Sequence, residues 1–236
     1  MKRFLKIVGI LILILPLAFA GYVAYRLTPK QLDLPLPEAL VAIDTDAGRA
    51  LLDSSNHAAD YPVLGETWEG QQLISYCGVA SGVAVVNALG QSVNQFNFFN
   101  ENTNSVRSRV EVTFGGMSLP DLAGLLEARG LEISTVHGDE LSLEAFRELV
   151  KSNLSREGDY LLVNYQREVL GQNRVGHISP VGAYNAAGDQ VLILDTADYK
   201  YPHTWVPLEA LYEAMQEKDS ASGRARGLVE VRLPGT

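Results

Sequence analysis

Cys77 is the single cysteine among 236 residues, and its setting favours a nucleophile. Apolar residues follow it at helical spacing, at Val79, Val83, Val86 and Leu89. This pattern predicts a buried helix over residues 77–89, with the cysteine in its first turn. The unpaired N–H groups at a helix N-terminus stabilise a thiolate and lower the pKa of a cysteine placed there. A lone cysteine is also a common core residue, so Cys77 needs partners before it can be assigned chemistry.

The expected partners are a histidine and an aspartate on a predicted hairpin. Residues 174–184 and 190–195 are typical of strands, and the turn-rich residues between them favour an antiparallel hairpin. His177 and Asp195 are equidistant from the middle of that turn, which would bring their Cβ atoms within about 5 Å. Asp195 would then orient the imidazole, and the other ring nitrogen would act as general base toward Cys77. A satisfied strand histidine is the alternative for His177.

Two further residues near the cysteine are weaker candidates. Gln71 precedes Cys77 by six residues, where a side-chain amide could complete an oxyanion hole with the N–H of Cys77. Tyr76 could line a cleft, although ordinary packing is an equal alternative for it.

The elements that must hold these residues alternate between helix and strand. About 200 residues beyond the N-terminal segment are enough for one well-filled domain. Ser118 is expected to cap a helix that ends at Gly130. The other expected elements are helices over 45–53 and 142–151, strands over 131–136 and 160–166, and an irregular loop over 95–104. The net charge of −9 argues against a nucleic-acid partner, because phosphate binding needs clustered Lys and Arg.

Residues 1–30 are typical of a signal peptide or an N-terminal membrane anchor. Lys2, Arg3 and Lys6 precede an apolar stretch over 7–20, and small residues up to Ala20 match a cleavage pattern. The apolar run continues to about 18 residues, the lower limit for a spanning helix, so cleaved leader and uncleaved anchor both stay open. Either way, the basic residues are expected to stay cytoplasmic and the domain to be extracytoplasmic. It would be free in the periplasm, or anchored in the membrane and facing the periplasm or the exterior.

Prolines mark residues 31–38 as a linker, and residues 39–236 are expected to form the catalytic domain. In an oxidising compartment a lone cysteine has no partner for a structural disulfide, which favours a reactive role for it.

The order Gln71, Cys77, His177, Asp195 resembles that of papain-like cysteine peptidases. Longer motifs resemble the phytochelatin synthase family: residues 71–89, VGHISPVGAY at 175–184, VLILDTADYKYPHTWVPL at 191–208 and GGMSL at 115–119. The resemblance covers most of the chain, from about Leu64 to Val231. It implies an α+β papain-like fold, in which the helical part carries the cysteine and an antiparallel sheet carries the histidine and aspartate. It also implies the triad Cys77, His177 and Asp195, with Gln71 at the oxyanion position.

The resemblance further implies glutathione as the substrate. The cysteine would attack the Cys–Gly bond, release glycine and pass the γ-glutamylcysteinyl group to water or to a second glutathione. Asp219 and Arg226 resemble the segment that holds the γ-glutamyl end, and Gly176 and Tyr76 are further implied substrate contacts. A carboxylate and a guanidinium suit that zwitterionic end. No protein-bound cofactor or metal is implied, but metal–glutathione thiolates could act as substrate or activator, and a homodimer stays open.

One departure bears on the acceptor. The family commonly has an arginine three residues after the triad aspartate, whereas this chain has Asp198. An acid there would repel anionic glutathione, so we expect transfer to water to exceed transfer to a second glutathione. Two other functions stay open: a peptidase that cleaves double-glycine leaders, and a non-catalytic extracytoplasmic binding module in which Cys77 is structural.

Overall fold

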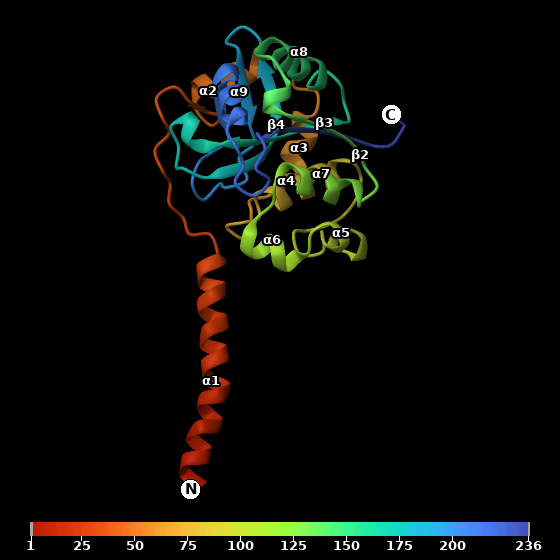
Figure 1. The fold of residues 1–236 in the computed structure, drawn as a ribbon. Helices are drawn as coiled ribbons and strands as arrows, with labels where there is room; N and C mark the ends of the chain where they lie inside the picture. Colours follow the sequence, from red (N-terminus) through yellow and green to blue (C-terminus); the bar gives the residue numbers. More distant parts are fainter. Residues whose placement is uncertain (1, 236) are drawn as a thin grey trace.

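An antiparallel sheet forms the centre of the structure (Figure 1). The computed structural model describes residues 2–235, and the side chains from residue 14 onward. Within these residues seven strands pair in the order β1-β6-β5-β4-β3-β7-β2. Their bounds are β1 Val41–Ala42, β2 Glu132–His137, β3 Asp159–Gln166, β4 Gly176–Asn185, β5 Gln190–Ile193, β6 Thr204–Pro207 and β7 Gly227–Arg232. The α+β class predicted from the sequence is therefore confirmed.

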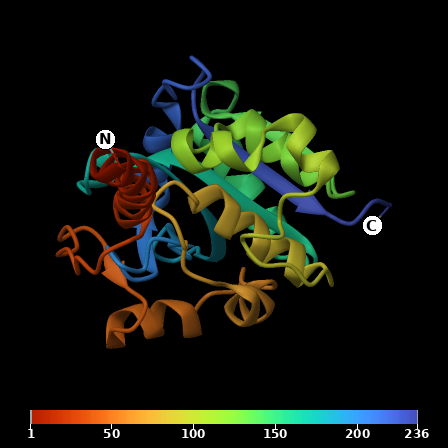
Figure 2. The same ribbon diagram turned by 90° about the horizontal axis from the view of Figure 1, so that it is seen from below.

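Helices pack on both faces of this sheet. The described residues form α1 Lys2–Leu27, α2 Asp46–Asp53, α3 Tyr61–Thr67, α4 Cys77–Ala88, α5 Glu101–Val106, α6 Arg109–Gly115, α7 Leu119–Glu127, α8 Leu143–Asn153 and α9 Leu208–Gln216, with the 3₁₀ turns η1 Gly138–Glu140 and η2 Arg167–Leu170. In Figure 1, α4 to α7 gather below the sheet, and α8 and α9 lie above it. The helix α1 extends away from the other elements and is seen end-on from below (Figure 2).

Two hydrophobic cores lie on opposite faces of the sheet, and β3 contributes to both. Leu162 packs with α4 and α7, whereas Leu161 and Val163 pack with α8 and α9. Successive side chains of a strand point to opposite faces, so a strand covered on both sides is a continuous apolar run. Asn164 interrupts that run at a position only 1% exposed.

Most expected elements are confirmed within a few residues. Ser118 caps α7, where its hydroxyl accepts from the N–H of Asp121, and Gly130 has a φ of +86° beyond the end of that helix. The prediction of an irregular loop over 95–104 is wrong at its end, because α5 begins at Glu101. Asn100 is the reason: its side chain accepts from the N–H of Thr103 at 3.0 Å, a strong helix-initiating contact.

The expected linker has no regular structure, but it lies against the domain. The N–H of Leu32 donates to the carbonyl of Tyr199 at 2.8 Å, and that of Leu34 to Lys200 at 2.9 Å. The end of α1 is also attached, because its Leu27 carbonyl accepts from the N–H of Ile74 at 2.9 Å. The linker therefore rests on the segment that follows Asp195.

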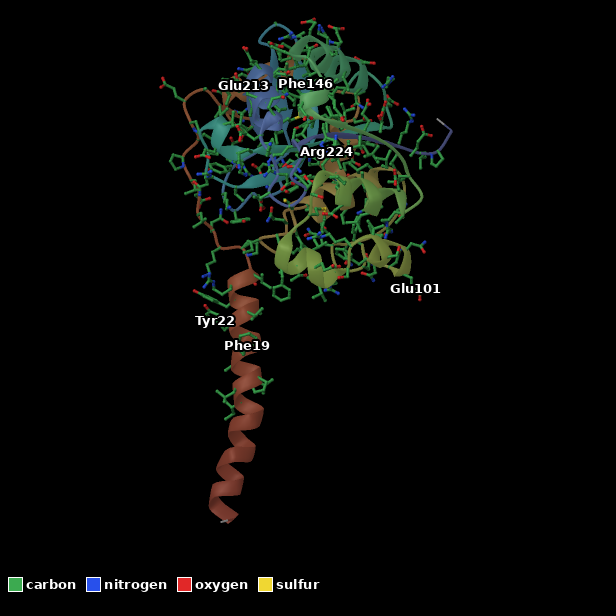
Figure 3. All side chains as sticks on the ribbon, viewed as in Figure 1. Phe19, Tyr22, Glu101, Phe146, Glu213 and Arg224 are labelled. Carbon is green, nitrogen blue, oxygen red and sulfur yellow. The ribbon has the colours of Figure 1, made fainter. Side chains whose placement is uncertain are left out.

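The described side chains of α1, from residue 14 onward, include exposed apolar ones, among them Phe19 and Tyr22, which are labelled in Figure 3. No helix in the described part of the chain is long and apolar enough to cross a membrane. The side chains of residues 2–13, where the predicted basic residues and much of the apolar stretch lie, are outside the described ones.

Candidate active site

Cys77 is the first residue of α4, as its sequence context predicted. It is partly exposed, whereas residues 78–86 behind it are buried. The hydroxyl of Ser81 donates to the carbonyls of Cys77 at 2.8 Å and of Ile178 at 3.1 Å, which ties the first turn of α4 to β4. The cysteine sulfur is therefore carried by a fixed element, in a residue that is only partly exposed.

A cleft of about 310 Å³ opens beside this sulfur. Its volume lies within the range of roughly 300–1,000 Å³ that small-molecule sites occupy. Of the residues singled out in the sequence, it brings together Cys77, Gly176, His177, Asp219 and Arg226. The other lining residues are Ile74, Ser75, Phe114, Gly115, Gly116, Met117, Asn164, Val175, Ser220 and Ala221.

His177 and Asp195 interact directly, although not through the register expected for them. The imidazole Nε2 lies 2.9 Å from Asp195 Oδ1, and both side chains are buried. The strands pair from Asn185 opposite Gln190, and a bulge shifts the register near Val181. Because β5 ends at Ile193, Asp195 lies just beyond the strand and reaches the histidine from there. With Nε2 on the carboxylate, Nδ1 is the ring nitrogen left to take a proton from a thiol.

Three donors converge on one oxygen of Asp195. Besides His177, Oδ1 accepts from Arg167 Nη2 at 2.7 Å and from the N–H of Ala197 at 2.8 Å. Burial works to raise the pKa of this carboxyl, but Arg167 and His177 outweigh burial and hold the pKa well below its usual range. Asp195 is therefore an ionised, fixed acceptor.

The same surroundings keep the histidine neutral. Burial, followed by the positive charge of Arg167, lowers the pKa of His177 to about 4, against the opposing effect of Asp195. Burial also raises the pKa of the Cys77 thiol, although backbone N–H groups of Ile178 and Gly78 act in the other direction. The lowered thiol pKa expected from the helix N-terminus is thus wrong, because desolvation exceeds the effect of the N–H groups.

Gln71 and Tyr76 do not line the cleft. Gln71 is buried, and its Nε2 donates to the carbonyl of Leu73 at 2.9 Å, while its Oε1 has no hydrogen-bond partner among the described residues. Tyr76 is fully buried, with its hydroxyl 2.9 Å from Thr113 Oγ1 and its ring against Phe99. The contacts of Tyr76 are therefore those of a packed core residue, which was the alternative to a cleft-lining role.

The cleft also holds a group of buried polar and charged side chains. Arg226 Nη1 lies 2.7 Å from Asn164 Oδ1 and 3.9 Å from Asp219 Oδ2, and all three side chains are buried. Arg226 Nε and Asn164 Nδ2 have no hydrogen-bond partner within the described residues. Gly176 makes room for this group, because a Cβ there would collide with the guanidinium of Arg226. The lining of the cleft thus includes both a carboxylate and a guanidinium.

Sequence reasoning missed two residues of the site. Asn164 carried a signal, since a polar residue inside an apolar run is more informative than an apolar one. Arg167 carried none: between Gln166 and Glu168 it has the appearance of a surface residue, yet it is fully buried. Within the part of the chain that the structure describes, no three His, Cys, Asp or Glu side chains are grouped so that they could hold a metal ion.

Taken together, the fold and the cleft define an α+β protein in which a cysteine and a histidine line a cleft and a buried aspartate holds the histidine. Comparisons with known proteins narrow this class. The family model described as phytochelatin synthase matches residues 31–228, and the chain belongs to that family.

Among curated proteins, the chain is 34% identical over 166 residues to glutathione gamma-glutamylcysteinyltransferase 1 of Arabidopsis thaliana. The aligned residues cover 68% of this chain and 34% of that protein. It is 31% identical over 206 residues to glutathione gamma-glutamylcysteinyltransferase 3 of Lotus japonicus, covering 85% and 42%. The protein of this name from Schizosaccharomyces pombe is 30% identical over 205 residues, covering 82% and 49%. The chain thus spans less than half the length of these relatives. Their names favour neither the leader peptidase nor the non-catalytic module.

Proposed function

We propose that this chain cleaves the Cys–Gly bond of glutathione through a thioester on Cys77. The observation that carries the proposal is the cleft that joins Cys77 and His177 to the pair Asp219 and Arg226. The names of the relatives suggest glutathione as the substrate and γ-glutamylcysteinyl as the transferred acyl group. In the cleft, Cys77 could attack the substrate, and Asp219 and Arg226 could bind its γ-glutamyl group. The proposal also includes the papain-like arrangement, which the helical cysteine and the strand-borne histidine support.

The chemistry runs through one proton carrier. His177 Nδ1 takes the proton of the Cys77 thiol as the sulfur attacks the carbonyl carbon of the Cys–Gly bond. The imidazolium then gives this proton to the departing amine of glycine, leaving a γ-glutamylcysteinyl thioester. Water, or the nucleophilic group of a second glutathione, loses a proton to His177, attacks the thioester and regenerates the thiol.

Substrate recognition is proposed for Asp219 and Arg226. The α-ammonium of the γ-glutamyl group would bind Asp219, and its α-carboxylate would bind Arg226. Both side chains line the cleft and lie 3.9 Å apart, which supports this orientation. Gln71 is proposed to serve the oxyanion after its Nε2 turns from Leu73 toward the cleft, together with the N–H of Cys77.

We further propose that hydrolysis exceeds transfer to a second glutathione. Asp198 is exposed and lies on the segment after Asp195, close to Gly70. Its charge would disfavour an anionic acceptor on that side. The Asp198→Arg variant should raise the share of polymer per glycine released several-fold, while Asp139→Arg, a matched change at an exposed turn, should not. Polymer formed by the wild type as fast as glycine would contradict this proposal.

The N-terminal segment is proposed to export or anchor the domain on the outer side of a membrane. Basic residues before an apolar stretch and the exposed apolar side chains of α1 support this location. A reporter that is active only outside the cytoplasm, fused to the C-terminus, should give a signal. A fusion that is expressed but inactive would contradict export.

Activity is tested by incubating the full chain with glutathione, with and without added Cd²⁺, and separating the products. Glycine and γ-glutamylcysteine in equal amounts, absent with Cys77→Ala, are the expected result. Intact glutathione, or cleavage that does not need Cys77, would contradict the proposed function.

A further inference from the structure

The side chain of Arg167 is fully buried directly behind the catalytic pair, although the sequence gives no sign of it. It follows β3 as the first residue of η2. Its Nη2 lies 2.7 Å from Asp195 Oδ1, the same oxygen that accepts from His177. A positive charge is thus held one carboxylate away from the imidazole.

The structure fixes this arginine from several sides. Its Nη1 donates to Gln172 Oε1 at 2.5 Å, and the rings of Tyr165 and Tyr201 lie 5.8 and 5.2 Å from the guanidinium carbon. Its backbone N–H donates to Val175 at 3.1 Å, which closes the loop that leads into β4. A guanidinium held in this way has little freedom to leave Asp195.

A buried cation near an imidazole disfavours the imidazolium, whereas a carboxylate favours it. Arg167 therefore opposes the usual effect of the triad aspartate. Burial is the largest cause of the low pKa of His177, and Arg167 adds to it, whereas the same charge acts to lower the pKa of the Cys77 thiol. Other charged or titratable groups also act on the imidazole. These are Asp195 and Lys200 after β5, Tyr165 on β3, and Cys77 on α4.

We propose that Arg167 is a positioning residue that fixes the orientation of Asp195 and keeps His177 neutral, so that the resting site holds a thiol and an imidazole rather than a thiolate–imidazolium pair. The thiol proton then moves to Nδ1 only as the sulfur attacks. This arrangement differs from cysteine peptidases in which a paired histidine gives the cysteine a pKa of about 3–4. The catalytic meaning of the inference rests on the proposed function, but its test does not.

Because Cys77 is the single cysteine, alkylation by iodoacetamide reports this thiol alone. The rate would be measured on the full chain as a function of pH, without glutathione. In the wild type it should rise with pH and show no plateau between about pH 5 and 7, since a preformed ion pair would give one. Arg167→Met should create such a plateau and raise the rate near pH 6 at least tenfold, because Asp195 then favours the imidazolium without the opposing charge of Arg167.

Two variants serve as controls. Arg167→Lys keeps the charge and should retain the wild-type profile, even if its looser contact with Asp195 slows glycine release. Arg174→Met removes an arginine of the same loop whose side chain is 82% exposed, and it should leave both the profile and the activity unchanged.

A fold check by circular dichroism accompanies each profile. If Arg167→Met does not fold, Gln172→Glu supplies the test, because a second carboxylate against Arg167 should produce a smaller shift in the same direction. An acid plateau in the wild type, or folded Arg167→Met and Gln172→Glu variants with the wild-type profile, would overturn the proposal. If the alkylation profiles are as expected but the wild type does not cleave glutathione, the result would count against the proposed function alone.

Discussion

Two ends of the site, a catalytic one with Cys77, His177 and Asp195 and a recognition one with Asp219 and Arg226, differ in how closely their opposite charges are paired. At the catalytic end, Asp195 Oδ1 accepts three hydrogen bonds of 2.7 to 2.9 Å, two of them from Arg167 and His177. At the recognition end, Arg226 Nη1 and Asp219 Oδ2 lie 3.9 Å apart, which is beyond hydrogen-bond distance. The carboxylate of the catalytic end is therefore fixed by its neighbours, whereas the two charges of the recognition end are not bonded to each other.

The largest effects should come from the catalytic end. Cys77→Ala and His177→Ala are expected to lower the rate of glycine release by a factor on the order of 10⁴ or more, with little change in KM. His57→Ala is the control, because this ring contacts Tyr184 and Ser155 away from the cleft. Full activity in either variant would show that Cys77 and His177 do not form the catalytic end of the site.

Substitutions at the recognition end should act mainly on binding. Arg226→Met and Asp219→Asn are expected to reduce kcat/KM for glutathione about 30-fold or more, chiefly through KM, since each leaves a buried charge unpaired. Arg224→Met is a matched control on the same loop, because Arg224 pairs with Glu140 outside the cleft. A fall in kcat at constant KM would show that the two ends are not separate in function.

Gly176→Ala tests whether the recognition end needs its open space. The added methyl group would displace the Arg226 guanidinium from Asn164, and we expect a loss of about tenfold in kcat/KM, most of it in KM. Gly188→Ala, in the β4–β5 turn, meets only ordinary contacts and should behave as the wild type. Unchanged KM in Gly176→Ala would show that Arg226 does not bind substrate from its present position.

The smallest effect is expected at Tyr76, next to the nucleophile but outside the cleft. Tyr76→Phe removes the hydrogen bond to Thr113 and should lower the free energy of unfolding by about 1 kcal/mol. Glycine release should stay within about twofold of the wild type, because the hydroxyl does not reach the substrate. A large rise in KM, with stability unchanged, would restore Tyr76 as a substrate contact.

The sequence predicted the elements of the site better than their geometry. Helical periodicity placed Cys77 at the start of α4, because local pattern and burial agree there. His177 and Asp195 were paired correctly, but the register was wrong, since the strands pair from Asn185 opposite Gln190 and a bulge near Val181 shifts them once more. Arg167 could not be found at all, because its burial depends on contacts with Gln172, Asp195 and Tyr201 that the chain makes only when folded.

The most direct test of the central claim is to trap the acyl-enzyme. The full chain would be mixed with glutathione, quenched in acid within the first turnover and measured by intact-protein mass spectrometry. We predict a mass increase of one γ-glutamylcysteinyl group, located on Cys77 and formed together with one equivalent of glycine, and no increase in Cys77→Ala. Glycine release with Cys77 unmodified at every time point, or an adduct that persists in Cys77→Ala, would contradict the account.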